Sequence, residues 1–141
     1  MKKLLLLSAF LLLTAAAFSQ SIVGVWKTID DEEHVAKSNV EITEKDGKYF
    51  GKVAELLRPA HVNDACTKCD DYRKDQPVKG MLIVENLYKN GSEWVGGQIL
   101  DPTKGKIYSC KMWLEDNNTL KVRGFLGISL IGRTQTWYRV K

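Results

Sequence analysis

The segment 106-KIYSCKMWLEDNNTLKVRGFL-126 contains two runs in which apolar and polar residues alternate, separated by a short polar stretch. A period of two predicts strands with one buried face, and the polar stretch 116–118 predicts the turn of a hairpin. The inward face of this hairpin would carry Tyr108, Cys110, Met112, Leu114, Leu120 and Val122.

The same unit of a short run followed by a turn recurs along the chain. Asp46-Gly47 and Asn90-Gly91 are hairpin turn signals, because glycine accepts a positive φ without steric cost. The expected strands cover 22–30, 39–44, 48–56, 81–87, 93–100, 106–115, 119–126 and 133–140. Short connections make sequence neighbours spatial neighbours, so the pattern predicts an all-β, eight-stranded antiparallel up-and-down barrel. A two-sheet sandwich is the alternative. Runs 81–87 and 93–100 are apolar on both faces, so their inward faces stay unassigned.

The first residues predict a secretory signal peptide. Lys2 and Lys3 precede the apolar run 4–13, and small residues follow it, with a cleavage site after Ser19. The run is shorter than the about 20 residues that a membrane-spanning helix needs. We therefore expect residues 1–19 to be removed and residues 20–141 to form one exported domain, periplasmic or extracellular, with no membrane span.

The charge of the chain does not favour binding to nucleic acid. The formal net charge is +4, two of the basic residues are in the leader, and the rest are interspersed with acidic ones. Binding to phosphates needs a concentrated basic face.

Gly24-Val25-Trp26 on the first expected strand resembles the G-x-W signature of lipocalin-like barrels. In those barrels the glycine lets the chain bend into the barrel floor and the tryptophan plugs that end. A basic side chain of the last strand often packs over the tryptophan. Arg133 and Arg139 are both candidates here.

Two longer motifs resemble a family of small secreted bacterial proteins known only as a domain of unknown function. The first is a Gly-Gly-x-Ile-x-Asp-Pro-x-x-Gly-Lys-x-Tyr run over residues 96–108, and the second joins residues 120–124 to Arg133, Gln135 and Trp137. The resemblance implies a lipocalin-like barrel and brings no established activity or catalytic residue.

The loop segment 61-HVNDACTKCDD-71 admits three kinds of chemistry. Structural zinc needs four ligands, and only one cysteine pair is present. A redox pair needs a helix after the motif to lower the thiol pKa, and Asp70 and Asp71 would raise it. Export favours a Cys66–Cys69 disulfide, with Cys110 as a buried free thiol. We expect no metal site and no cofactor.

The sequence offers little support for other catalytic sites. His34 and His61 read as loop residues, and no nucleophile elbow, zinc-protease motif or phosphate loop is present. The Asp-Pro-Thr-Lys-Gly stretch reads as a turn. The polar side chains of the last two strands, Arg123, Arg133, Gln135 and Arg139, read either as a ligand clamp or as solvated strand faces. We expect no enzyme.

The connection before the last strand, 125-FLGISLIG-132, is unusually apolar. It would either pack as a lid on the barrel or form an exposed partner patch. The residues concerned are Phe125, Leu126, Ile128, Leu130 and Ile131.

The leading functional hypothesis is a secreted protein that binds a small apolar molecule inside the barrel. The expected lining residues are Trp26, Tyr108, Met112, Val122 and Tyr138. One alternative is an envelope interaction protein that uses the 125–131 connection or the 57–79 cysteine loop, and another is a thiol redox enzyme. The ligand and the oligomeric state are left open.

Overall fold

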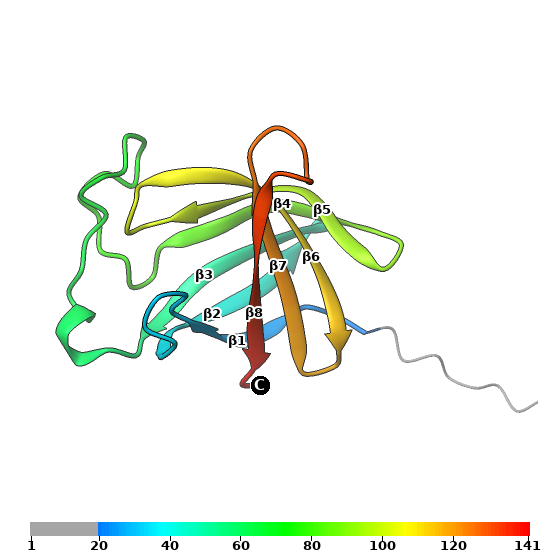
Figure 1. Ribbon diagram of the computed structural model, residues 1–141, viewed down its shortest axis with the longest axis horizontal. Helices are drawn as coiled ribbons and strands as arrows, with labels where there is room; N and C mark the ends of the chain where they lie inside the picture. Colours follow the sequence, from blue (N-terminus) through cyan, green and yellow to red (C-terminus); the bar gives the residue numbers. More distant parts are fainter. Residues whose placement is uncertain (1–19) are drawn as a thin grey trace, which may run out of the picture.

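A computed structural model of the protein describes residues 20–141, so the predicted signal peptide of residues 1–19 lies outside the described residues. Eight antiparallel strands close into a barrel in sequence order (Figure 1). Their bounds are β1 (Gly24–Ile29), β2 (Ala36–Lys45), β3 (Lys48–Leu56), β4 (Leu82–Asn90), β5 (Glu93–Asp101), β6 (Lys106–Asp116), β7 (Thr119–Phe125) and β8 (Gly132–Arg139). The predicted up-and-down barrel is confirmed. The sandwich alternative is wrong, because β8 pairs back onto β1.

The two ends of the barrel differ in their connections. The tight turns after β2, β4 and β6 share one end with both chain termini of the described segment, and we call this the closed end. The longer connections after β1, β3 and β7 share the other end with the β5–β6 turn, and we call this the open end (Figure 1). The longest connection runs from β3 to β4 and contains one 3-10 turn, Pro59–His61.

Trp26 and Arg139 build the closed end. The Trp26 side chain is fully buried, and its Nε1 donates a hydrogen bond to the Ile22 carbonyl at 2.8 Å. The Arg139 guanidinium carbon lies 4.3 Å from the centre of the Trp26 ring. Its nitrogens donate to the carbonyls of Asn117, Val23 and Ser21 at 2.7, 3.0 and 2.8 Å. Of the two candidate arginines, Arg139 therefore covers the tryptophan, and it also ties the N-terminal segment to the β6–β7 turn.

Gly24 is required at this end. Its φ is +144°, and a Cβ there would lie 2.6 Å from the Lys141 carbonyl and 2.7 Å from the Arg139 guanidinium. Only glycine allows the chain to pass so close beneath the arginine.

The interior of the barrel is filled by its own side chains at the closed end and in the middle. The inner face carries buried residues from every strand, among them Trp26, Val40, Ile42, Val53, Val84, Leu87, Trp94, Cys110, Met112, Leu120, Val122 and Trp137. Two glycines make room for this packing. A Cβ at Gly97 would lie 2.5 Å from the Glu85 carbonyl and 2.7 Å from Leu87, and one at Gly51 would lie 2.9 Å from Val84.

Gly97 and Gly124 provide a matched pair for testing this packing. We expect Gly97→Ala to lower the free energy of unfolding by about 1–3 kcal/mol, because backbone and core must move to admit the methyl group. Gly124→Ala should leave it unchanged or raise it by up to about 1 kcal/mol, since its Cβ would meet Tyr108 at an ordinary 3.4 Å. Urea unfolding of both variants measures the difference. Equal destabilisation of both would contradict the assignment of a tightly filled core at Gly97.

Arg139 should contribute to stability through the tryptophan and the three carbonyls together. We expect Arg139→Met to lower the free energy of unfolding by about 2–3 kcal/mol, because hydrogen bonds to a charged group and a cation–π contact are lost. Arg133→Met on the same strand is the control and should cost less than about 1 kcal/mol, since Arg133 is largely exposed. The same loss in both variants would show that Arg139 has no special role in closure.

Candidate functional site

The inner face of the barrel near the open end is only partly covered. Ile99 on β5 and Tyr108 on β6 are paired in register and are part-exposed. Gly124 on β7 lies beside both, because a Cβ there would be 3.4 Å from the Tyr108 Cβ and 3.7 Å from Ile99. We call Ile99, Tyr108 and Gly124 the open-end apolar surface. Unlike the inner face at Gly97, this surface would accept a methyl group on Gly124 without a clash.

A polar rim borders this surface on the β8 side. Gln135 accepts a hydrogen bond from the Trp137 indole at 3.1 Å and donates to Asp31 at 2.7 Å. Asp31 also pairs with Arg133, 2.8 Å away. Across the rim, Arg58 pairs with Asp30 and Glu33 at 3.4 and 3.2 Å. Gln135 and Arg133 therefore bind the β1–β2 connection, whereas Arg139 lies at the closed end. The use of these residues as a ligand clamp stays a prediction.

The apolar connection between β7 and β8 stands out from the open end (Figure 1). Leu126, Ile128, Leu130 and Ile131 are 57, 59, 85 and 66% exposed, and Phe125 is part-exposed. Arg123 holds the backbone of this connection from the outer face, donating to the Ser129 carbonyl at 2.7 Å. The reading of this segment as a plug packed into the barrel is wrong, and its use as a partner patch stays a prediction.

The five predicted lining residues lie in different environments. Trp26, Met112 and Val122 point inward but are covered almost completely by their neighbours. Tyr108 points inward and is part-exposed. Tyr138 does not line the interior as predicted. Its neighbour Trp137 occupies the inner face, so strand alternation places Tyr138 outside, where it is 44% exposed.

Sequence reasoning missed Ile99 and Gly124. Ile99 lies in a run that is apolar on both faces, so alternation alone did not assign it. Gly124 could have been found, because it follows Leu120 and Val122 with the same period. A glycine on an inward face leaves space unless a neighbour fills it.

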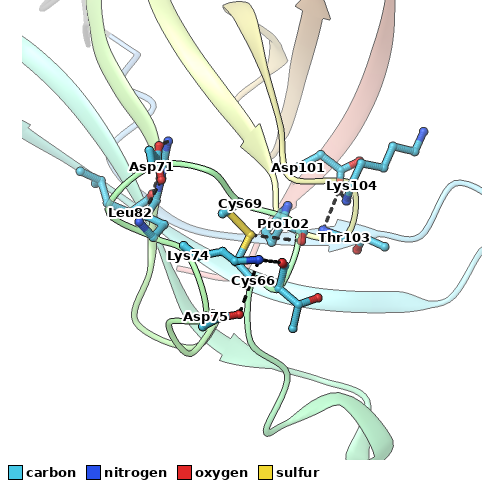
Figure 2. Close-up of a disulfide and its surroundings, with 12 residues drawn as sticks. Cys66, Cys69, Asp71, Lys74, Asp75, Leu82, Asp101, Pro102, Thr103 and Lys104 are labelled. Atoms are coloured by element: carbon cyan, nitrogen blue, oxygen red, sulfur yellow. Dashed lines mark hydrogen bonds and ion pairs between the residues drawn. A yellow bond between two sulfur atoms is a disulfide. The ribbon is translucent and has the colours of Figure 1, made fainter.

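The cysteine loop carries the predicted disulfide. Cys66 and Cys69 are bonded, and both are buried (Figure 2). The Cys66 sulfur lies 3.4 Å from the Pro102 carbonyl of the β5–β6 turn. That turn closes through a hydrogen bond from the Gly105 N–H to the Asp101 carbonyl at 2.8 Å, which confirms the reading of Asp-Pro-Thr-Lys-Gly as a turn. A Cβ at Gly105 would lie 2.1 Å from the Lys68 carbonyl, so the two loops touch through their backbones.

Arg73 fastens the same loop to the outer wall of the barrel. Its buried guanidinium pairs with Asp71 at 2.7 Å and with Glu85 of β4 at 3.3 Å, and it donates to the Leu82 carbonyl at 2.9 Å. The hydrogen bonds from Arg73 hold the pKa of Asp71 below its usual range.

Leu100 explains why the β5 run is apolar on both faces. Alternation places it outside the barrel, yet it is only 4% exposed because this wall is covered.

These contacts bear on the chemistry predicted for the loop. With Cys66 and Cys69 bonded to each other and buried, the loop presents no open thiolate in this state. His61 is exposed and pairs with Asp64 at 2.8 Å. Residues 20–141 contain no group of three or more histidine, cysteine, aspartate or glutamate side chains placed to hold a metal ion. No helix in the same range is long and apolar enough to cross a membrane.

Comparisons with known proteins agree with the barrel. A family model described as "Uncharacterized protein conserved in bacteria (DUF2147)" matches residues 24–139. Protein HP1028 from Helicobacter pylori, described as belonging to the lipocalin family, superposes with a TM-score of 0.77 over 87% of this chain and 85% of its own, at 19% identity. At that identity the likeness concerns the fold. No curated protein matches the sequence.

Thiol titration should distinguish the three cysteines. Cys110 is the free cysteine of the described chain, and burial raises its pKa to about 12. We expect Ellman's reagent to find no reactive thiol in the folded protein at mildly alkaline pH. Unfolding in guanidinium should expose one, and unfolding with prior reduction should expose all three cysteines of the sequence. Two or more reactive thiols in the folded protein would contradict the closed disulfide and reopen the redox hypothesis.

Proposed function

The chain belongs to the bacterial DUF2147 family, and we propose that it is an exported, lipocalin-like binding protein that holds a small, mainly apolar molecule at the open end of its barrel. The observation that carries the proposal is the contrast along the inner face. The barrel is packed at Gly97, whereas Ile99, Tyr108 and Gly124 are part-exposed, and a Cβ on Gly124 would meet the other two only at ordinary van der Waals distances. Ligand sites of this kind combine an apolar wall with a few polar groups.

The rim supports a ligand with one polar end. Gln135 and Asp31 are oriented by their hydrogen bonds to each other and to Trp137. Oriented polar groups beside an apolar wall would fix the direction of a bound molecule. Trp26, Met112 and Val122 would then support the site from below and would not contact the ligand, since they are already covered.

Export, removal of residues 1–19 and a single domain over 20–141 are parts of the proposal. The leader pattern supports export. The buried Cys66–Cys69 disulfide is also compatible with an oxidising compartment outside the cytoplasm. The proposal includes no enzymatic activity.

The exposed β7–β8 connection favours a second candidate function, contact with a partner in the cell envelope. Four aliphatic side chains at least 57% exposed within six residues form a patch that water solvates poorly. The two functions are compatible, because a partner at the open end would meet the ligand where it enters.

Fluorescence of the apolar dye N-phenyl-1-naphthylamine tests the binding site. We expect the dye to bind the native protein and Gly124→Leu to weaken binding about tenfold or more, because the leucine side chain would occupy the space beside Tyr108 and Ile99. Thr43→Leu, which adds similar bulk to an exposed position of β2, is the control and should leave the affinity unchanged.

A double variant of the connection, Leu130→Ser with Ile131→Ser, separates the two candidate functions. It should retain dye binding if the open-end apolar surface is the site. Loss of binding in this variant together with full binding by Gly124→Leu would overturn the proposal and place the dye on the exposed connection.

A further inference from the structure

The most exposed aliphatic side chains of residues 20–141 gather at one point. Leu126, Ile128, Leu130 and Ile131 are each more than half exposed, and all four belong to the β7–β8 connection. The other exposed aliphatic side chains in this range lie elsewhere in the chain and are at most half exposed. The connection projects from the open end as a convex loop (Figure 1). We call residues 126–131 the apolar tip.

The backbone of the apolar tip is partly held by contacts within the chain. The Ile131 N–H donates to the Ile128 carbonyl at 3.1 Å. Arg123 of β7 donates from Nε to the Ser129 carbonyl at 2.7 Å and from Nη2 to the Leu130 carbonyl at 3.4 Å. A backbone polar group that leaves water without a partner costs free energy. These contacts therefore make it easier for the tip to enter an apolar medium.

The composition of the apolar tip fits a lipid surface better than a specific protein partner. Binding energy between proteins concentrates on tryptophan, tyrosine and arginine, whereas leucine and serine are under-represented. A specific interface also takes about 20–30 residues from each protein. The tip consists of leucine, isoleucine, serine and glycine and has no aromatic residue. Aliphatic side chains of this kind can enter the boundary between headgroups and acyl chains, which needs no complementary shape.

The charge near the apolar tip is complementary to anionic headgroups. Residues 117–141 contain no aspartate or glutamate. Arg123, at the base of the tip, donates to carbonyl and hydroxyl oxygens and forms no ion pair within the described part of the chain. Lys104 and Lys106, at the β5–β6 turn of the same end, are exposed. These basic side chains would be attracted to a negatively charged membrane surface.

The acidic β1–β2 connection lies behind the apolar tip. In Figure 1 it is found along the barrel wall, away from the projecting loop, and its Asp31 is hydrogen-bonded to Gln135 within β8. Arg58 and Arg133 pair with carboxylates of this connection. The tip therefore reaches a flat surface before these carboxylates do.

We propose that the apolar tip docks the barrel on an anionic lipid bilayer, with Leu126, Ile128, Leu130 and Ile131 in the boundary between headgroups and acyl chains. This inference rests on the second candidate function and names lipid as the partner in the envelope. Arg123 and the tip backbone would lie at the level of the headgroups. Insertion of four aliphatic side chains gives weak, reversible binding, which anionic headgroups strengthen.

A fluorescent label on the tip tests insertion. Cys110 is buried and Cys66 and Cys69 form a disulfide, so a cysteine introduced by Leu130→Cys can be labelled selectively with an NBD maleimide. We expect its emission to rise and shift to shorter wavelength with vesicles of phosphatidylcholine and phosphatidylglycerol in equal parts. The same label on Thr43→Cys, an exposed position of β2, should not respond. No response of the tip label, or equal responses of both labels, would overturn the proposal.

Serine substitutions test whether the aliphatic side chains cause binding. Leu130→Ser with Ile131→Ser should reduce co-sedimentation of the unlabelled protein with these vesicles at least tenfold, because two apolar side chains no longer leave water. Val23→Ser with Val140→Ser removes two exposed aliphatic side chains at the closed end and should have no effect. Equal losses would reject the tip as the docking site. Both variants should still bind N-phenyl-1-naphthylamine, so a failure of lipid docking is distinguishable from a failure of the ligand site.

Lipid composition and the alternative occupants complete the test. Vesicles of phosphatidylcholine alone should bind about fivefold more weakly, since the basic side chains lose their attraction. Salt at about 0.5 M should remove this difference. Equal binding to both vesicles at low salt would refute an anionic surface as the partner. If a photocrosslinker at position 130 traps one envelope protein in cells and vesicles do not bind, the second candidate function stands and the lipid inference falls. A dimer in sedimentation that the double serine variant of the tip abolishes would identify a second copy of the chain and also refute it.

Discussion

Closure of the sheet on itself is the constraint on which the rest of the structure depends, and it rests on a small area. Trp26 and Lys27 of β1 pair with Arg139 and Tyr138 of β8, and the backbone of Val25 is hydrogen-bonded to Val140 and Lys141. Arg139 joins the indole, the N-terminal segment and the β6–β7 turn. An eight-stranded sheet left open would expose two edges and its apolar inner face. The contacts around Trp26 thus hold together a core to which every strand contributes.

Because β1 and β8 pair over a short length, the two halves of the barrel differ. In the filled part of the barrel the inner face is packed so closely that Gly51 and Gly97 have no space for a methyl group. Toward the open end β1 leaves β8, the inner residues become part-exposed, and side chains of Asp31, Arg133 and Gln135 bridge what backbone pairing does not. The proposed ligand site follows from this incomplete closure at the open end.

The cysteine loop has a structural part in this arrangement. It covers the outer wall of β4 and β5, where Arg73 pairs with Glu85 and the disulfide lies against the β5–β6 turn (Figure 2). Two glycines of the 96–108 segment lie at close approaches: Gly97 admits Leu87, and Gly105 admits the backbone of Lys68. At these two positions the segment serves the packing of the loop and the core.

The sequence by itself determined the strands, their order and the inward face of most of them, because hydrophobic alternation and turn residues are local. It also predicted the disulfide and the buried state of Cys110. It could not assign the β4 and β5 runs, since Leu100 is covered by a loop distant in the chain. It wrongly placed Tyr138 inside the barrel. It left open whether Arg133 or Arg139 covers Trp26, and whether the 125–131 connection is a lid or an exposed patch. These questions are decided by contacts between segments that are far apart in the sequence. Only the tertiary structure shows such contacts, because it brings β8 back to β1.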